Sequence, residues 1–248
     1  MARKINLLAF SLFLVLLIAL PMLFVDRFLS NTQRPWQLLP FGADSLSGFY
    51  KEHYSIIEEG SLFSRLADTA KPTVIVMVDG WGVPYNERML SKDFDIFANN
   101  AAQYALHKRM FGITALAESE ELSKGFSDGL FIFGGDSSTC EKKQKSLKRD
   151  FVQIECCVNC GDAKMISVMD SLILERSWNR VAWTTSQTRE GDRDSLHLCL
   201  RGLAEQAKKH PDYQFIIQGT HWPILGTPET RRKYLKPWVP AVFINGER

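Results

Sequence analysis

The chain has 248 residues, 45% of them hydrophobic, and a formal net charge of +2. This length fits one medium-sized domain with a proper hydrophobic core. The near-neutral charge argues against a nucleic-acid-binding protein, since the only dense basic cluster, between Lys142 and Arg149, is spread over a helical stretch and is expected to form a solvated face.

The N-terminus has the pattern of a membrane anchor. Arg3 and Lys4 precede an apolar run from Ile5 to Val25, which carries no charge and is long enough to cross a bilayer as a helix. Positive residues before the span favour an N-terminus in the cytoplasm and a chain that is outside after Asp26. A cleaved signal peptide is the alternative, but the run exceeds the usual length and lacks a small-residue cleavage site. We expect residues 1–30 to anchor the protein in the inner (cytoplasmic) membrane by a single pass.

An outside location would expose the cysteines to an oxidising compartment. A disulfide or idle thiols are the first interpretation, with at least one thiol left over. Structural zinc is the second, although a closed site needs four ligands and only three cysteines lie close together. Redox catalysis is the third interpretation. The five residues are Cys140, Cys156, Cys157, Cys160 and Cys199.

Residues 31–71 are mixed and loop-rich, and we interpret them as a linker that docks on the domain formed by residues 72–248. Within this linker, Tyr54 to Ala67 has apolar residues at helical spacing, which predicts one packing helix.

From Thr73 onward, short apolar strands alternate with helical patterns. This alternation predicts an α/β fold with a mostly parallel sheet and helices on both faces. The expected strands are Val74–Val78, Gly129–Phe133, Phe151–Glu155, Arg180–Thr184, Tyr213–Gln218 and Val239–Ile244. The expected helices are Phe94–Met110, one from Ser137–Thr139 through Leu147, Met165–Leu174 and Asp194–Lys209.

The first of these strands ends in the sequence Asp79-Gly80-Trp81-Gly82-Val83-Pro84. An acid stands where the strand ends, and two glycines let the backbone turn sharply. Ligands in open α/β sheets gather outside the carboxyl ends of the strands, so Asp79 is well placed for a metal or a substrate. Taken alone, Asp79 is equally well explained as a residue that caps the following turn.

Three other strand ends carry polar groups: Asp136, then Thr184-Thr185-Ser186, then Thr220-His221. If the strands are parallel, all of these groups point to the same edge of the sheet. A single histidine after an apolar run is more often structural than a ligand, but His221 next to an acid from another strand end forms a common type of metal site.

A candidate nucleophile lies in the segment from Gly112 to Glu118. Thr114 would sit in a loop or at a helix N-terminus, where free backbone N–H groups favour an anion such as phosphate or sulfate. A metal would lower the pKa of its hydroxyl enough for attack on phosphorus. The alternative is that Thr114 is an N-cap, with Glu118 just inside the helix.

Together these motifs resemble the alkaline phosphatase superfamily. They are most similar to its membrane-anchored sulfatase-like branch, which includes lipoteichoic acid synthase and phosphoglycerol or phosphoethanolamine transferases. Asp79 matches the acidic metal ligand that ends the first strand, and Gly112-x-Thr114 looks like the segment with the threonine nucleophile. Ile216 to His221 resembles the Gly-Asp-His-Gly metal motif, and the similarity spans about residues 72 to 245.

The resemblance implies a metal-dependent transferase or hydrolase of phosphate or sulfate esters outside the inner membrane. Asp79 and His221 would bind zinc or manganese, and Thr114 would be the nucleophile. Its substrate would be a membrane lipid or an envelope glycan, with no nucleic acid involved. Weaker assignments to substrate binding fall on Arg189, Arg193, Asp136 and Thr220.

The chain departs from the family pattern at the metal motif. Thr220 stands where the family has an aspartate, and Trp222 replaces the following glycine. A histidine that often follows the fourth strand is also missing. Loss of a carboxylate weakens a site for a dication. The alternative function is therefore a catalytically inactive relative that binds a glycan, a lipid headgroup or a partner protein.

Overall fold

The computed structural model describes residues 45–109, 118, 121–122, 129–135, 141, 153–158, 161–174, 178–185, 192–224 and 226–246. The expected anchor (residues 1–30), Thr114, Asp136 and Arg189 lie outside these residues, as do Cys140, Cys160 and most of the helix expected up to Leu147. Within the described ranges, no helix has the length and apolar character needed to cross a membrane.

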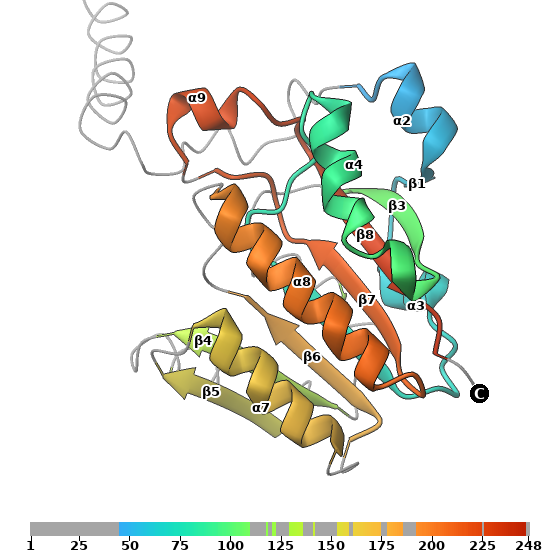
Figure 1. Cartoon of the computed structure of the whole chain (residues 1–248), viewed down its shortest axis with the longest axis vertical. Helices are drawn as coiled ribbons and strands as arrows, with labels where there is room; N and C mark the ends of the chain where they lie inside the picture. The colour runs from blue at the N-terminus through green and yellow to red at the C-terminus, as the bar shows by residue number, and fades with distance from the viewer. Residues whose placement is uncertain are drawn as a thin grey trace, which may run out of the picture.

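The described part of the chain is built on one eight-stranded sheet with the strand order β1-β3-β8-β7-β2-β6-β4-β5 (Figure 1). Strand β8 is antiparallel to its neighbours β3 and β7, and every other neighbouring pair is parallel. The prediction of an α/β fold with a mostly parallel sheet is confirmed. The strands are β1 Ser55–Ile57, β2 Thr73–Val78, β3 Gln103–Lys108, β4 Leu130–Gly135, β5 Gln153–Val158, β6 Arg180–Thr184, β7 Gln214–Gly219 and β8 Trp238–Ile244.

Helices cover both faces of this sheet. Along β2, Val74, Val76 and Val78 pack in the core formed with α4, α7 and α8. Ile75 and Met77 alternate with them and pack on the opposite face, with α3. Burying a side chain of this size is worth about 1.5–3 kcal/mol, so a strand buried on both faces anchors the whole domain.

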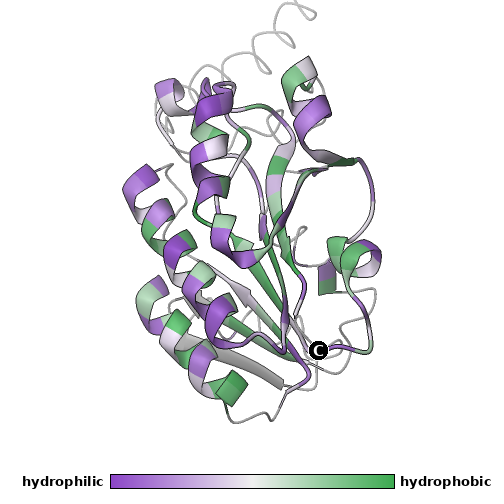
Figure 2. Ribbon diagram, turned by 45° about the vertical axis from the view of Figure 1, so that its right-hand side comes forward, coloured by the Kyte–Doolittle hydropathy of each residue, from purple (hydrophilic) through white to green (hydrophobic). Residues whose placement is uncertain are grey.

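Figure 2 shows the central strands in green and the helices that cover them striped in purple and green, as expected for amphipathic helices. Asp192 caps α8, since its carboxylate accepts hydrogen bonds from the backbone N–H groups of Asp194 and Ser195. The helices are α2 Gly48–His53, α3 Leu62–Leu66, α4 Glu87–Asp95, α7 Asp162–Leu174, α8 Arg193–Lys209 and α9 Pro228–Arg231, with a 3₁₀ turn at Ala98–Asn100.

The helix predicted for Phe94–Met110 is wrong. The actual helix, α4, ends at Asp95, and the stretch from Gln103 to Lys108 is strand β3. Ala101 separates the two elements with a left-handed φ of 49°. Leu106 and Ala105 then pack in the cores on opposite faces of the sheet, which is the two-residue period of a strand. No glycine or proline marks the change from helix to strand in the sequence, so the pattern was assigned to one long helix.

The single packing helix predicted for Tyr54–Ala67 is also wrong. This stretch forms strand β1 and helix α3, separated by Gly60 with a φ of 86°. Strand β1 pairs with β3 and forms one edge of the main sheet. Residues 45–71 therefore contribute α2, β1 and α3 to the domain.

Candidate functional site

Strands β2 and β7 are parallel neighbours, with Val78 opposite Gly219. The residues that follow them are consequently brought together at the carboxyl edge of the sheet. Oδ1 of Asp79 accepts a hydrogen bond from the Thr220 hydroxyl at 3.0 Å and lies 3.0 Å from Nε2 of His221. All three residues are buried. The structure thus brings together three of the residues that the sequence indicated.

A backbone contact fixes the orientation of the His221 ring. Nδ1 of His221 lies 2.6 Å from the carbonyl oxygen of Trp222. A carbonyl oxygen can only accept, so Nδ1 carries a hydrogen and donates it. Nε2 then faces Asp79 either as the second N–H of an imidazolium or with a lone pair that can bind a metal.

The Asp79–His221 spacing fits two ligands of one metal ion. Nitrogen and oxygen ligands of zinc lie about 2.0–2.2 Å from it, and two such ligands are roughly 3.0–3.5 Å apart. The Thr220 hydroxyl adds one more oxygen next to Asp79. Within the described ranges, no group of three or more His, Cys, Asp or Glu residues could hold a metal. Asp79 and His221 would therefore supply two ligands, fewer than the four of a closed zinc site.

The end of strand β6 also contributes to this edge. The backbone N–H of Asp79 donates to the Thr185 hydroxyl at 2.9 Å. The backbone N–H of Thr185 in turn donates to the carbonyl of Met77 at 2.9 Å. The residue after β6 thus holds the Asp79 backbone in place.

The loop after β2 packs directly on the loop after β7, and glycines make this contact sterically feasible. A Cβ on Gly219 would lie 1.9 Å from the Trp81 carbonyl oxygen, and a Cβ on Gly82 would lie 2.6 Å from Cα of Trp222. Gly80 has a φ of 72°, in the region that favours glycine. Gly82 and Gly219 therefore allow the loops that carry Asp79 and His221 to pack at this short distance.

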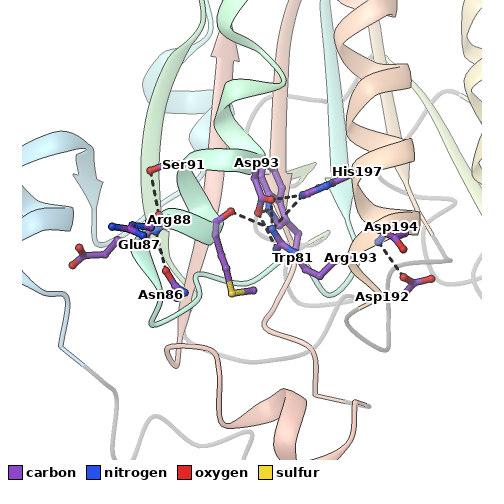
Figure 3. A network of polar contacts seen from close by, with 11 residues as sticks. Trp81, Asn86, Glu87, Arg88, Ser91, Asp93, Asp192, Arg193, Asp194 and His197 are labelled. Carbon is purple, nitrogen blue, oxygen red and sulfur yellow. Dashed lines mark hydrogen bonds and ion pairs between the residues drawn. The ribbon is translucent and has the colours of Figure 1, made fainter.

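A buried carboxylate supports the loop after β2 from the helical side (Figure 3). Oδ2 of Asp93, on α4, accepts a hydrogen bond from the Trp81 indole at 3.1 Å and another from Nη1 of Arg193 at 3.1 Å. His197, on α8, places Nε2 2.8 Å from Oδ1 of Asp93. Burial lowers the pKa of Arg193, but the charge contact and hydrogen bond with Asp93, together with smaller contributions from Tyr234, outweigh burial and raise that pKa above its ordinary value.

The structure gives Arg193 a partner that the sequence analysis did not foresee. Arg193 was expected to bind a substrate anion, and its guanidinium instead contacts Asp93 and the carbonyl of Met89. The role of Asp93 was missed. The sequence did contain a sign of this role. Asp93 shares the buried face of α4 with Leu90 and Phe94, and a buried charged residue needs a partner.

The cysteine predictions are tested only at Cys199. Its thiol is free and buried, and burial raises its pKa. Cys156 and Cys157 lie in strand β5. The proposed pairing or zinc binding of the cluster stays a prediction.

Comparison with known proteins gives similarities at the level of structure. No protein-family model matches the chain, and no curated protein matches it in sequence. It is similar to the lipoteichoic acid synthase LtaP from Listeria monocytogenes, with 11% identity and a TM-score of 0.45 over 84% of this chain and 70% of that chain. It is also similar to the C-terminal periplasmic domain of EcEptC from Escherichia coli in complex with Zn, with 9% identity and a TM-score of 0.47 over 71% and 74%.

A third similar structure is a protein in the alkaline phosphatase superfamily from Vibrio parahaemolyticus, with 15% identity and a TM-score of 0.45 over 88% of this chain and 67% of that chain. The resemblance expected from the motifs is thus also found among solved structures.

Proposed function

We propose that this protein is a metal-dependent transferase or hydrolase of phosphate or sulfate esters. The observation that supports this most directly is the 3.0 Å approach of Asp79 and His221 at the carboxyl edge of the sheet. This is the edge at which α/β proteins bind their ligands.

In this proposal Asp79 and His221 hold one zinc or manganese ion. The Trp222 carbonyl keeps the His221 ring oriented through Nδ1, and the Thr220 hydroxyl orients the Asp79 carboxylate. A bound dication would supply Lewis-acid stabilisation of an ester oxygen and would favour the ionised form of a nearby hydroxyl. Thr114 would be the nucleophile, a role that rests on the sequence motif.

The substrate-binding assignments are also proposals. Arg189 and Asp136 would contact the anionic part of the substrate. Arg193 would do so only with donors that remain after its contacts with Asp93 and Met89. The ester itself would belong to a membrane lipid or an envelope glycan.

Metal binding tests the proposal. Titration calorimetry of the full chain with zinc and with manganese is expected to show one site, and His221→Ala or Asp79→Asn is expected to abolish it. His53→Ala is the matched control, since His53 is an exposed histidine on α2. A wild-type protein that binds neither ion would contradict the proposal.

Ester turnover provides the second test. Thr114→Ala is expected to abolish turnover of a chromogenic phosphate or sulfate ester while metal binding is kept, because the hydroxyl attacks and the metal is held by other residues. Full activity in that variant would remove Thr114 from the mechanism.

We also propose that residues 5–25 anchor the protein in the inner membrane with the domain outside the cytoplasm. This rests on the apolar run and on Arg3 and Lys4 before it. Deletion of residues 1–30 is expected to release a folded, soluble domain. Membrane association of the truncated protein in high salt would contradict a single anchor.

A catalytically inactive relative that binds a glycan, lipid headgroup or partner protein is the second candidate. It is supported by Thr220, which donates a hydrogen bond to Asp79 where the family has a second carboxylate. With one carboxylate, Asp79 and an imidazolium of His221 would neutralise each other without a metal. This candidate predicts no response of thermal stability to zinc or manganese.

A further inference from the structure

An ion pair between two helices contacts the loops of both candidate metal ligands. Both Nη atoms of Arg193, on α8, contact the carboxylate of Asp93, on α4, and Nη1 lies 3.1 Å from Oδ2 (Figure 3). The Asp93 side chain has no exposed surface. A guanidinium that meets a carboxylate with two nitrogen atoms fixes the orientation of both groups. The ion pair therefore offers a fixed contact point for the loops around it.

Asp93 holds the loop after β2, which carries Asp79. Its Oδ2 accepts a hydrogen bond from the Trp81 indole at 3.1 Å, and Trp81 lies two residues after Asp79. The backbone N–H of Trp81 donates to the Val78 carbonyl, which closes the turn around Asp79. The Trp81 side chain is fully buried, so its N–H needs a hydrogen-bonding partner within the protein. Asp93 therefore fixes the direction in which this turn leaves strand β2.

Arg193 holds the segment after β7, which carries His221. Its guanidinium donates a hydrogen bond to the Tyr234 hydroxyl. Tyr234 packs in a small buried cluster with Trp222 and Ile224. The Trp222 carbonyl accepts the hydrogen bond from Nδ1 of His221. This series of contacts leads from Arg193 to the residue that orients the His221 ring.

We propose that the ion pair of Asp93 and Arg193 positions both candidate metal ligands and thereby sets the metal affinity of the site. The inference deepens the proposed function and rests on it. Asp93 acts through Trp81 and Arg193 acts through Tyr234, so one ion pair governs both loops. Two ligands that are already held at their binding distance lose little conformational freedom when a metal binds, and the affinity is higher for that reason.

Two conservative substitutions in the full chain test this inference. Arg193→Lys keeps the charge but removes the planar fork of donors, so it is expected to loosen both loops. Tyr234→Phe removes only one hydroxyl and is expected to loosen the segment after β7 alone. Titration calorimetry with zinc and with manganese measures the affinity. We expect it to fall about ten-fold in each variant, as is typical when a residue that orients a metal ligand is replaced.

Amide hydrogen exchange of the metal-free protein, followed by mass spectrometry, gives a second readout. Peptides that cover residues 79–86 and 220–224 are expected to exchange about five-fold faster in Arg193→Lys. In Tyr234→Phe only the peptide of residues 220–224 is expected to change. This readout does not depend on metal binding or on turnover.

Tyr213→Phe is the matched control for Tyr234→Phe. Tyr213 is equally buried and lies directly before strand β7, and its hydroxyl donates to the Trp178 carbonyl at 3.1 Å. Loss of either hydroxyl is expected to lower the free energy of unfolding to a similar extent, but only Tyr234→Phe is expected to weaken metal binding. A purely structural role would not produce this difference. Arg201→Lys, at an exposed position of α8, is the control for Arg193→Lys and is expected to change neither readout.

The outcomes separate the inference from the proposed function. Wild-type metal affinity in both Arg193→Lys and Tyr234→Phe, or an equal loss in Tyr213→Phe, would overturn the inference. A wild type that binds neither zinc nor manganese would overturn the proposed function. The exchange experiment would then still decide whether the ion pair holds the loops, and unchanged exchange at residues 79–86 and 220–224 would show that it does not. If Arg193→Lys does not fold, Tyr234→Phe gives both readouts.

Discussion

Gly219 and Trp81 touch backbone to backbone, so that a Cβ on Gly219 would lie 1.9 Å from the Trp81 carbonyl oxygen. No side chain fits into this space. The contact lies between the loop that carries Asp79 and the loop that carries His221, and it brings these loops within hydrogen-bonding distance of each other.

Gly219→Ala is therefore expected to destabilise the fold strongly. Because the clash is with a backbone atom, it cannot be relieved by a side-chain rotation, and we expect a loss of about 3 kcal/mol or more in the free energy of unfolding. Urea unfolding measures this loss. Zinc binding is expected to weaken as well, since the two loops must separate.

Gly48→Ala is the matched control for this substitution. Gly48 begins helix α2, and a Cβ there would meet nothing within 4 Å. Alanine is expected to leave the free energy of unfolding unchanged or to raise it by up to about 1 kcal/mol. An equal loss in both variants would show that the contact with Trp81 is not the cause.

Much of the fold and part of the site could be predicted from the sequence, for one physical reason. Parallel strands bring their carboxyl ends to one edge, so the residues after β2 and β7 had to meet once the alternation of strands and helices was recognised. Asp79 and His221 follow from that rule without any knowledge of side-chain packing.

The rest of the site depends on contacts that no local pattern contains. Asp93 meets Arg193 and His197, which lie 100 and 104 residues further along the chain. Arg109 similarly reaches Gln218 across 109 residues. The sequence spacing of these residues carries no trace of these contacts, because they arise from the crossing of helices and strands in three dimensions.

Asp93→Asn is expected to lower the free energy of unfolding by about 3 kcal/mol or more. The change leaves Arg193 without its anionic partner and weakens the support of the Trp81 indole. Glu205→Gln is the control, since its contact with Lys208 is exposed and is expected to contribute less than about 1 kcal/mol. Similar losses for the two variants in urea unfolding would contradict the importance of the Asp93 contacts.

His107 is expected to make the fold sensitive to acid. Burial, with a smaller contribution from the charge of Arg109, lowers the pKa of His107 from 6.5 to about 3. Above pH 6.5 the ring is neutral in both states and stability is fully present. As the pH falls toward 3, the unfolded chain binds a proton that the folded chain excludes, so the free energy of unfolding falls by about 1.4 kcal/mol per pH unit.

His107→Leu is expected to remove this contribution. Between pH 7.5 and pH 5.0 the wild type should lose about 2 kcal/mol more than the variant in urea unfolding. His53→Leu is the control, because His53 is exposed and its replacement should leave the acid sensitivity as it is. Equal pH dependence of the wild type and His107→Leu would show that His107 is not the source.

The Thr220→Asp variant tests whether Asp79 and His221 still bind a metal weakly or no longer bind one. The new carboxylate would lie next to Asp79, whose Oδ1 is now 3.0 Å from the threonine hydroxyl, so repulsion is expected to lower the metal-free stability by about 1–3 kcal/mol. A dication would neutralise both acids, and added zinc should then raise the melting temperature more than in the wild type. Thr220→Asn has nearly the same shape without the charge and is expected to show no such gain. If zinc stabilises the Asp and Asn variants equally, the extra carboxylate does not contact the metal and the site at Asp79 and His221 is not organised as we propose.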